Sequence, residues 1–214
     1  RVHQRRWTGF HSHQRWSSRG EIKRLADEHS IRAHGHGMKA ELAMAHKAAQ
    51  ITAKLTENGT IEPAHALFLV HDTDGEEAVE ANLREGAARK GGSHTFQVIV
   101  AAPHPESEAW VVAGAALRSR DEKARHHAER RRLGFDPVTS PERLSSNRST
   151  DKRDAKRVCV EILGASGDAY ESWAPCWKET PLDVLERNAA LAGLRSYTRQ
   201  VERMLLPLVG DGTP

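Results

Sequence analysis

The predicted fold rests on one stretch of the chain, Ala66-Leu67-Phe68-Leu69-Val70-His71-Asp72-Thr73-Asp74-Gly75. Its first five residues form an uninterrupted apolar run bounded by turns, which is typical of a strand buried on both faces of a parallel sheet. Two aspartates separated by a single residue follow the run, and a glycine comes directly after them. The sequence therefore predicts a strand over 66–70 that ends in a pair of carboxylates.

A second strand is predicted downstream. A helix is expected over 76–89, and the apolar run Phe96–Ala101 reads as another buried strand, followed by Pro103-His104-Pro105-Glu106-Ser107-Glu108. Two parallel strands joined by a helix form a βαβ unit, and ligands of such sheets lie at the carboxyl ends of the strands. Both acidic clusters are therefore expected at one edge of one sheet.

Four carboxylates are candidate ligands for Mg²⁺ or Mn²⁺, namely Asp72, Asp74, Glu106 and Glu108. Paired carboxylates repel one another unless a cation lies between them, and a hard cation prefers oxygen ligands. Asp72, Asp74 and Glu108 are also catalytic candidates, and Glu108 is favoured over Glu106 because it directly precedes Ala109-Trp110. The alternative is structural, since the aspartates could cap the next helix and the glutamates could place favourable charge at a helix N-terminus.

The order of these motifs resembles that of Toprim-like proteins encoded beside ATPases in bacterial phage-defence islands. The resemblance covers roughly residues 35–163 and rests on the Asp-x-Asp-Gly turn and on three further segments, Pro103–Trp110, Leu133–Pro137 and Asp151–Arg157. It implies a Toprim fold and Mg²⁺-dependent phosphodiester chemistry, related to that of topoisomerases, primases and nucleases of the overcoming-lysogenization-defect type. It also implies an ATPase partner, and an oligomeric complex is expected.

One feature of the chain departs from the Toprim pattern. Toprim domains carry a glutamate at the end of their first strand. Here the first acidic residue is Glu21, which lies in a segment with helical spacing of its apolar residues. We therefore expect the isolated chain to be a weak nuclease or an inactive one.

Basic residues are the candidates for holding nucleic acid. Lys152 and Lys156 are expected four residues apart on one face of a helix over 151–163, and Lys156 is also a catalytic candidate that could neutralise charge on a phosphoryl group. Arg5, Arg6 and Arg15 alternate with tryptophans, a composition that suits phosphate contacts with base stacking. The alternatives are a solvated helix face for the lysines and a segment that docks on a partner for the arginines.

The chain is expected to comprise a basic N-terminal segment over 1–30, a Toprim-like α/β core over 31–117 and a helical C-terminal region over 118–214. The core is predicted to be a mostly parallel sheet flanked by helices. Further helices are expected over 21–29, 38–55, 108–117, 118–132 and 182–208, a short strand over 31–34 and a loop over 137–150.

Composition limits the remaining classes of function. The 214 residues have a formal net charge of only +3, so nucleic-acid binding has to come from local clusters of charge. The two cysteines, Cys159 and Cys176, form no close pair, which argues against a zinc knuckle or a disulfide framework. No apolar run is long enough to span a bilayer, and a cytoplasmic protein is expected.

Other functions fit the motifs less well. A nucleotide-sugar transferase also uses an Asp-x-Asp pair after a strand, but usually needs a longer catalytic half. A phosphatase of the haloacid-dehalogenase class would have its first aspartate on the first strand. An EF-hand is excluded because the sixth and twelfth positions counted from Asp72 are Glu77 and Leu83. A Toprim-like scaffold without catalytic activity remains open.

Overall fold

The computed structural model describes residues 18–32, 38–89, 95–146, 150–164 and 169–208, and the side chains of 169–172 are left out of the description. The predicted Arg5, Arg6 and Arg15 lie outside the described residues. Helices predominate, and β1 (Ala66–Val70) and β2 (Gln97–Ala101) pair in parallel. The mixed α/β class is therefore confirmed, with two strands in the described part of the chain.

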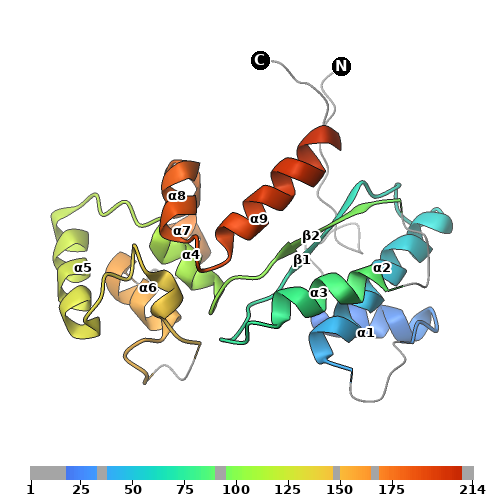
Figure 1. The fold of residues 1–214 in the computed structure, drawn as a ribbon, viewed down its shortest axis with the longest axis horizontal. Helices are drawn as coiled ribbons and strands as arrows, with labels where there is room; N and C mark the ends of the chain where they lie inside the picture. Colours follow the sequence, from blue (N-terminus) through green and yellow to red (C-terminus); the bar gives the residue numbers. More distant parts are fainter. Residues whose placement is uncertain (1–17, 33–37, 90–94, 147–149, 165–168, 209–214) are drawn as a thin grey trace. The chain divides into compact units, whose positions relative to one another are not determined.

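The chain divides into two compact units, and Figure 1 labels the helices and strands that belong to them. The first comprises Arg1–Leu69 and Ala81–Val100, and the second comprises Val70–Glu80 and Ala101–Pro214. Each unit is described by itself below. The two acidic segments identified in the sequence both belong to the second unit.

The first unit is built on helices α1 (Arg19–Glu28) and α2 (Ala40–Glu57), which pack against each other. Ser18 and Glu21 form a capping box at the start of α1, in which each side chain accepts a hydrogen bond from the other's backbone N–H. The first acidic residue of the chain therefore serves a helix terminus and does not end a strand. Ile31 and Arg32 are not in a strand, contrary to the prediction for 31–34, whose last two residues lie outside the description.

Helix α3 (Val79–Ala88) follows β1 as predicted, and its part within the first unit approaches α2 closely. A Cβ atom on Gly86 would lie 2.2 Å from the carbonyl oxygen of Leu42. Only a glycine permits the two helices to come this near at this point, because any side chain would displace the α2 backbone.

The first strand is less buried than its apolar composition predicts. Leu69 is buried, but Val70 is 48% exposed and the three residues before them are half-buried. The prediction of a strand buried on both faces is therefore wrong for β1. Within the described residues β1 pairs only with β2, and the exposure of its side chains shows that its faces are incompletely covered.

In the second unit, the short helix α4 (Ser107–Ala113) packs against four other elements. These are the 3₁₀ turn η1 (Pro141–Arg143) and the helices α6 (Ala155–Leu163), α7 (Ala169–Lys178) and α8 (Leu182–Asn188). Helix α5 (Arg120–Leu133) packs on α6. The core between these helices contains Val112, Val158 and Ile162. Cys159 and Cys176 are free, buried thiols in the same core.

The C-terminal residues form several short helices where one long helix was predicted. Helix α8 is followed by α9 (Leu194–Gln200), the π-helical turn η2 (Val201–Leu205) and the 3₁₀ turn η3 (Leu206–Leu208). Gly193 separates α8 from α9 because it adopts φ +90°, which lies outside the helical region. In the described residues, no helix has both the length and the apolar character needed to cross a membrane.

Helix α7 was not predicted from the sequence. Trp173 is buried in the core, and the ring of Trp177 lies 6.1 Å from that of Trp110 in an edge-to-face arrangement. The sequence does not predict α7 because Pro175 lies inside it, and proline disfavours the interior of a helix.

We predict that Gly193→Ala destabilises the second unit more than Gly134→Ala does. Both glycines have a positive φ, but a Cβ on Gly193 would lie 2.6 Å from the Ala102 carbonyl oxygen, whereas a Cβ on Gly134 meets nothing within 4 Å. The additional clash should cost about 1–3 kcal/mol. Urea unfolding of both variants measures the difference, and equal free energies of unfolding would contradict the packing described here.

Candidate functional site

The two acidic segments lie side by side at the carboxyl ends of the strands. Three backbone hydrogen bonds join them, from His71 N–H to the Ala101 carbonyl (3.0 Å), from Thr73 N–H to the Pro103 carbonyl (2.9 Å) and from Asp74 N–H to the Pro105 carbonyl (3.0 Å). The pairing of β1 with β2 therefore continues past the strands. The sheet edge brings the two clusters together, as the parallel arrangement predicts.

Thr73 anchors the turn between the two aspartates. Its side chain is buried, and its hydroxyl lies 2.8 Å from His104 Nδ1, within hydrogen-bond distance. Asp74 (φ +50°) and Gly75 (φ +83°) then reverse the chain through the left-handed region. The Asp74 side chain is exposed, so the pair Asp72 and Asp74 is divided between a partly buried carboxylate and a solvated one.

Asp72 caps the first turn of α4. Its Oδ1 accepts a hydrogen bond from the Ser107 N–H at 2.9 Å. Burial raises the pKa of Asp72, and the negative charges of Glu108 and Asp74 raise it further, while the hydrogen bond from Ser107 opposes them. The structural alternative considered for Asp72, a helix cap, is thus present, although the capped helix is α4 and not the helix that directly follows the turn.

Glu106 is the most buried carboxylate of the cluster. It occupies the residue before α4, and only 6% of its surface is exposed. Burial raises its pKa to about 7. Its Oε2 is buried and has no hydrogen-bond partner within the described residues. Glu108, which the sequence favoured, is only half-buried and accepts a hydrogen bond from the Ser107 hydroxyl at 3.3 Å.

Lys156 reaches the cluster from α6. Its Nζ lies 3.8 Å from Glu106 Oε1, and its side chain is 61% exposed. The negative charges of Glu106 and Glu108 raise the pKa of this amine. The predicted Lys156 thus sits beside the predicted carboxylates, because α6 packs on α4.

Lys152 does not share a helix face with Lys156. Asp154 caps α6 by accepting a hydrogen bond from the Arg157 N–H at 2.8 Å, so the helix begins at Ala155. The helix predicted over 151–163 is therefore too long at its start, and Lys152 lies in the preceding turn. The sequence places an aspartate at both 151 and 154, and each could have been the cap.

The side chains of the acidic cluster offer oxygen ligands, which a hard cation prefers. Asp72, Glu106 and Glu108 offer carboxylate oxygens, and the unpartnered Glu106 oxygen is one that a cation would satisfy. Within the described residues, no three histidine, cysteine or acidic side chains are already gathered as a ligand group. Cation binding here therefore requires side-chain rotation, since these carboxylates repel one another without a cation between them.

Comparison of the chain with protein-family models, with curated proteins and with solved structures gives no match. What the site does is therefore inferred from its own residues and from the motif resemblance.

We predict that Glu106→Gln stabilises the metal-free protein at pH 8. Folded Glu106 holds its proton up to about pH 7, whereas an unfolded chain releases it near the ordinary value of 4.5. Rising pH across this interval therefore destabilises the wild-type fold, and glutamine removes the penalty. The variant should gain about 1–3 kcal/mol at pH 8 and almost nothing at pH 4. Urea unfolding in EDTA at both pH values is the measurement, and a variant that is less stable than wild type at pH 8 would refute the prediction.

Proposed function

We propose that this chain is a Mg²⁺-dependent nuclease or nuclease-like subunit of the Toprim type, which acts on nucleic-acid phosphodiesters together with an ATPase. The observation that supports the proposal best is the unpartnered, buried oxygen of Glu106, beside Asp72, Glu108 and the amine of Lys156. The reaction class and the ATPase come from the motif resemblance.

An ionised buried carboxylate without a full set of partners destabilises a fold, and above its pKa a ligand that supplies positive charge would remove that cost. Lys156 supplies part of it from 3.8 Å, yet the second oxygen of Glu106 stays unpaired. Asp72, Glu106 and Glu108 would hold the cation. A bound Mg²⁺ or Mn²⁺ would polarise a phosphoryl oxygen and lower the pKa of a coordinated water.

The protein's own groups have separate roles in this proposal. The hydrogen bond from Ser107 N–H holds Asp72 in place. The exposed Lys156 amine is free to turn toward a phosphate and to offset the charge that develops on it. Asp74 is exposed and lies in the adjoining turn, so it would reach the cation from the solvent side of the site.

A Toprim-like scaffold without catalysis is the second candidate, and specific contacts favour it. The Asp72 carboxylate already caps α4, Lys156 already pairs with Glu106, and Glu21 serves the capping box of α1. In that case the cluster is an ion network that joins α4 to α6. The two candidates differ in whether the cluster binds a cation.

We predict that Asp72→Asn and Glu106→Gln each weaken Mn²⁺ binding at least tenfold. Each variant removes one charged oxygen ligand and keeps nearly the same side-chain volume. Asp121→Asn is the matched control, because Asp121 is an exposed acid in the first turn of α5. Titration calorimetry at pH 8 measures the affinities. If wild type and all three variants bind Mn²⁺ alike, the cluster is not a metal site and the scaffold is favoured.

We predict that Lys156→Ala lowers Mg²⁺-dependent cleavage about 10²-fold and changes DNA affinity less than threefold, because a contact made to developing charge acts on rate. Single-turnover cleavage of a plasmid at high protein concentration is the assay, since the isolated chain should be a weak nuclease. Equal losses in cleavage and affinity would mean that Lys156 only holds substrate. An unchanged rate would remove it from the reaction.

A further inference from the structure

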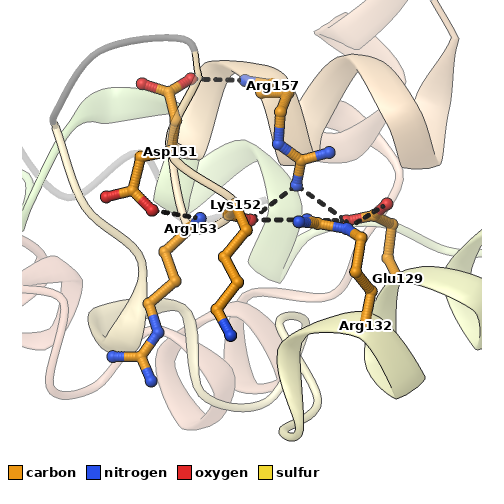
Figure 2. Close-up of polar contacts among 7 residues, drawn as sticks. Glu129, Arg132, Asp151, Lys152, Arg153 and Arg157 are labelled. Atoms are coloured by element: carbon orange, nitrogen blue, oxygen red, sulfur yellow. Dashed lines mark hydrogen bonds and ion pairs between the residues drawn. The ribbon is translucent and has the colours of Figure 1, made fainter.

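The turn that precedes α6 is held by two arginines. Nη2 of Arg132, on α5, and Nη2 of Arg157, on α6, both donate to the carbonyl oxygen of Lys152, at 2.5 and 2.7 Å (Figure 2). On the other side of the turn, Asp151 accepts a hydrogen bond from the Arg153 N–H at 2.9 Å. The backbone of the turn is therefore fixed at consecutive residues.

Both arginines are in turn fixed by Glu129, whose side chain is buried to all but a small fraction. Arg132 donates to its two oxygens through Nε (3.0 Å) and Nη2 (2.5 Å), and Arg157 Nη2 donates to Oε2 at 2.9 Å. We call Glu129, Arg132 and Arg157 the guanidinium knot. Charge-assisted bonds of this kind are strong and directional, so the knot determines where the turn lies.

The side chains of Lys152 and Arg153 leave this turn in the same general direction, away from the Glu129 carboxylate (Figure 2). Both are exposed, and Lys152 makes no ion pair within the part of the chain that the structure describes. The Arg153 guanidinium lies 5.8 Å from the centre of the Phe135 ring, and that of Arg143 lies 4.3 Å from it. Cation–π contacts with the Phe135 ring thus hold the positive charges of Arg143 and Arg153 near each other.

The surrounding sequence is basic, although the chain as a whole is nearly neutral. Residues 118–157 contain 13 lysines and arginines against 7 aspartates and glutamates, whereas the whole chain has a net charge of +3. The excess of positive charge is therefore local. Such a cluster attracts a polyanion at close range and supplies contacts that do not depend on base sequence.

We propose that Arg143, Lys152 and Arg153 form a binding surface for the phosphate backbone of nucleic acid, and that the guanidinium knot positions it. Of these three residues, only Lys152 was predicted from the sequence, paired with Lys156 on one face of a helix. The structure instead assigns it to a rigid turn with two arginines. This proposal does not depend on the metal site or on cleavage, because binding can be measured in EDTA.

The number of phosphate contacts can be tested by charge removal. Lys152→Ala with Arg153→Ala should lower the affinity for a labelled DNA duplex at least fivefold and reduce the slope of log K against log salt by about two units. The control double variant Lys23→Ala with Lys39→Ala removes the same charge from two exposed lysines of the first unit. Fluorescence anisotropy in EDTA, from low to moderate salt, measures both quantities. Equal effects of the two double variants would overturn the proposal.

The role of the knot can be tested with a variant for which simple electrostatics predicts a gain in DNA affinity and the positioning role predicts a loss. Glu129→Gln adds one unit of positive charge, so a purely electrostatic surface would bind DNA more tightly. If the knot positions the turn, binding should weaken about threefold or more. Because Glu129 is buried, Arg132→Lys serves as a second variant that keeps the net charge and loses the paired contacts. Thermal melting confirms that each variant is folded, and a folded Arg132→Lys variant with wild-type affinity would exclude the positioning role.

A competitor separates nucleic acid from other polyanions. An unlabelled duplex should displace the labelled one at far lower concentrations of negative charge than polyglutamate does. If polyglutamate competes equally well, and the Lys152 and Arg153 double variant loses both ligands alike, the surface recognises acidic polymers in general, and the assignment to nucleic acid is wrong.

Discussion

The second unit depends on the continuation of backbone pairing beyond the two strands. The hydrogen bonds from Thr73 to Pro103 and from Asp74 to Pro105 hold the two strand-end segments together where no sheet remains. They place Asp72 within reach of the Ser107 N–H, and so position the start of α4. Without this pairing the carboxylates that follow β1 and those that follow β2 would repel one another into solvent.

Helix α4 transmits that constraint to the rest of the unit. Because α4 packs on α6, its start meets the first turn of α6, and Lys156 comes to face Glu106. The same start of α6 is tied to α5 through the bond of Arg157 to Glu129. The acidic cluster and the guanidinium knot thus both contact the first turn of α6. A substitution in either should first change the orientation of α6.

Local patterns predicted the elements well and their surroundings poorly. The strand over 66–70 follows from a five-residue apolar run, yet the exposure of Val70 depends on what packs against its face of the sheet, which the run does not show. Lys152 and Lys156 read as helix neighbours because nothing local chooses between Asp151 and Asp154 as the cap. The burial of Glu106 and of Glu129 could not be predicted, since it depends on how α6 packs on α4 and on α5, which no local pattern in the sequence shows.

The two buried glutamates differ in a way that bears on function. Glu129 accepts hydrogen bonds from two guanidinium groups, as a buried carboxylate that is held by protein groups alone should. Glu106 has one exposed lysine at 3.8 Å, an oxygen without a partner and a pKa raised to about 7. One chain thus contains a satisfied carboxylate and an unsatisfied one of similar burial. That contrast favours a ligand for Glu106, because a merely structural carboxylate could have been completed as Glu129 is.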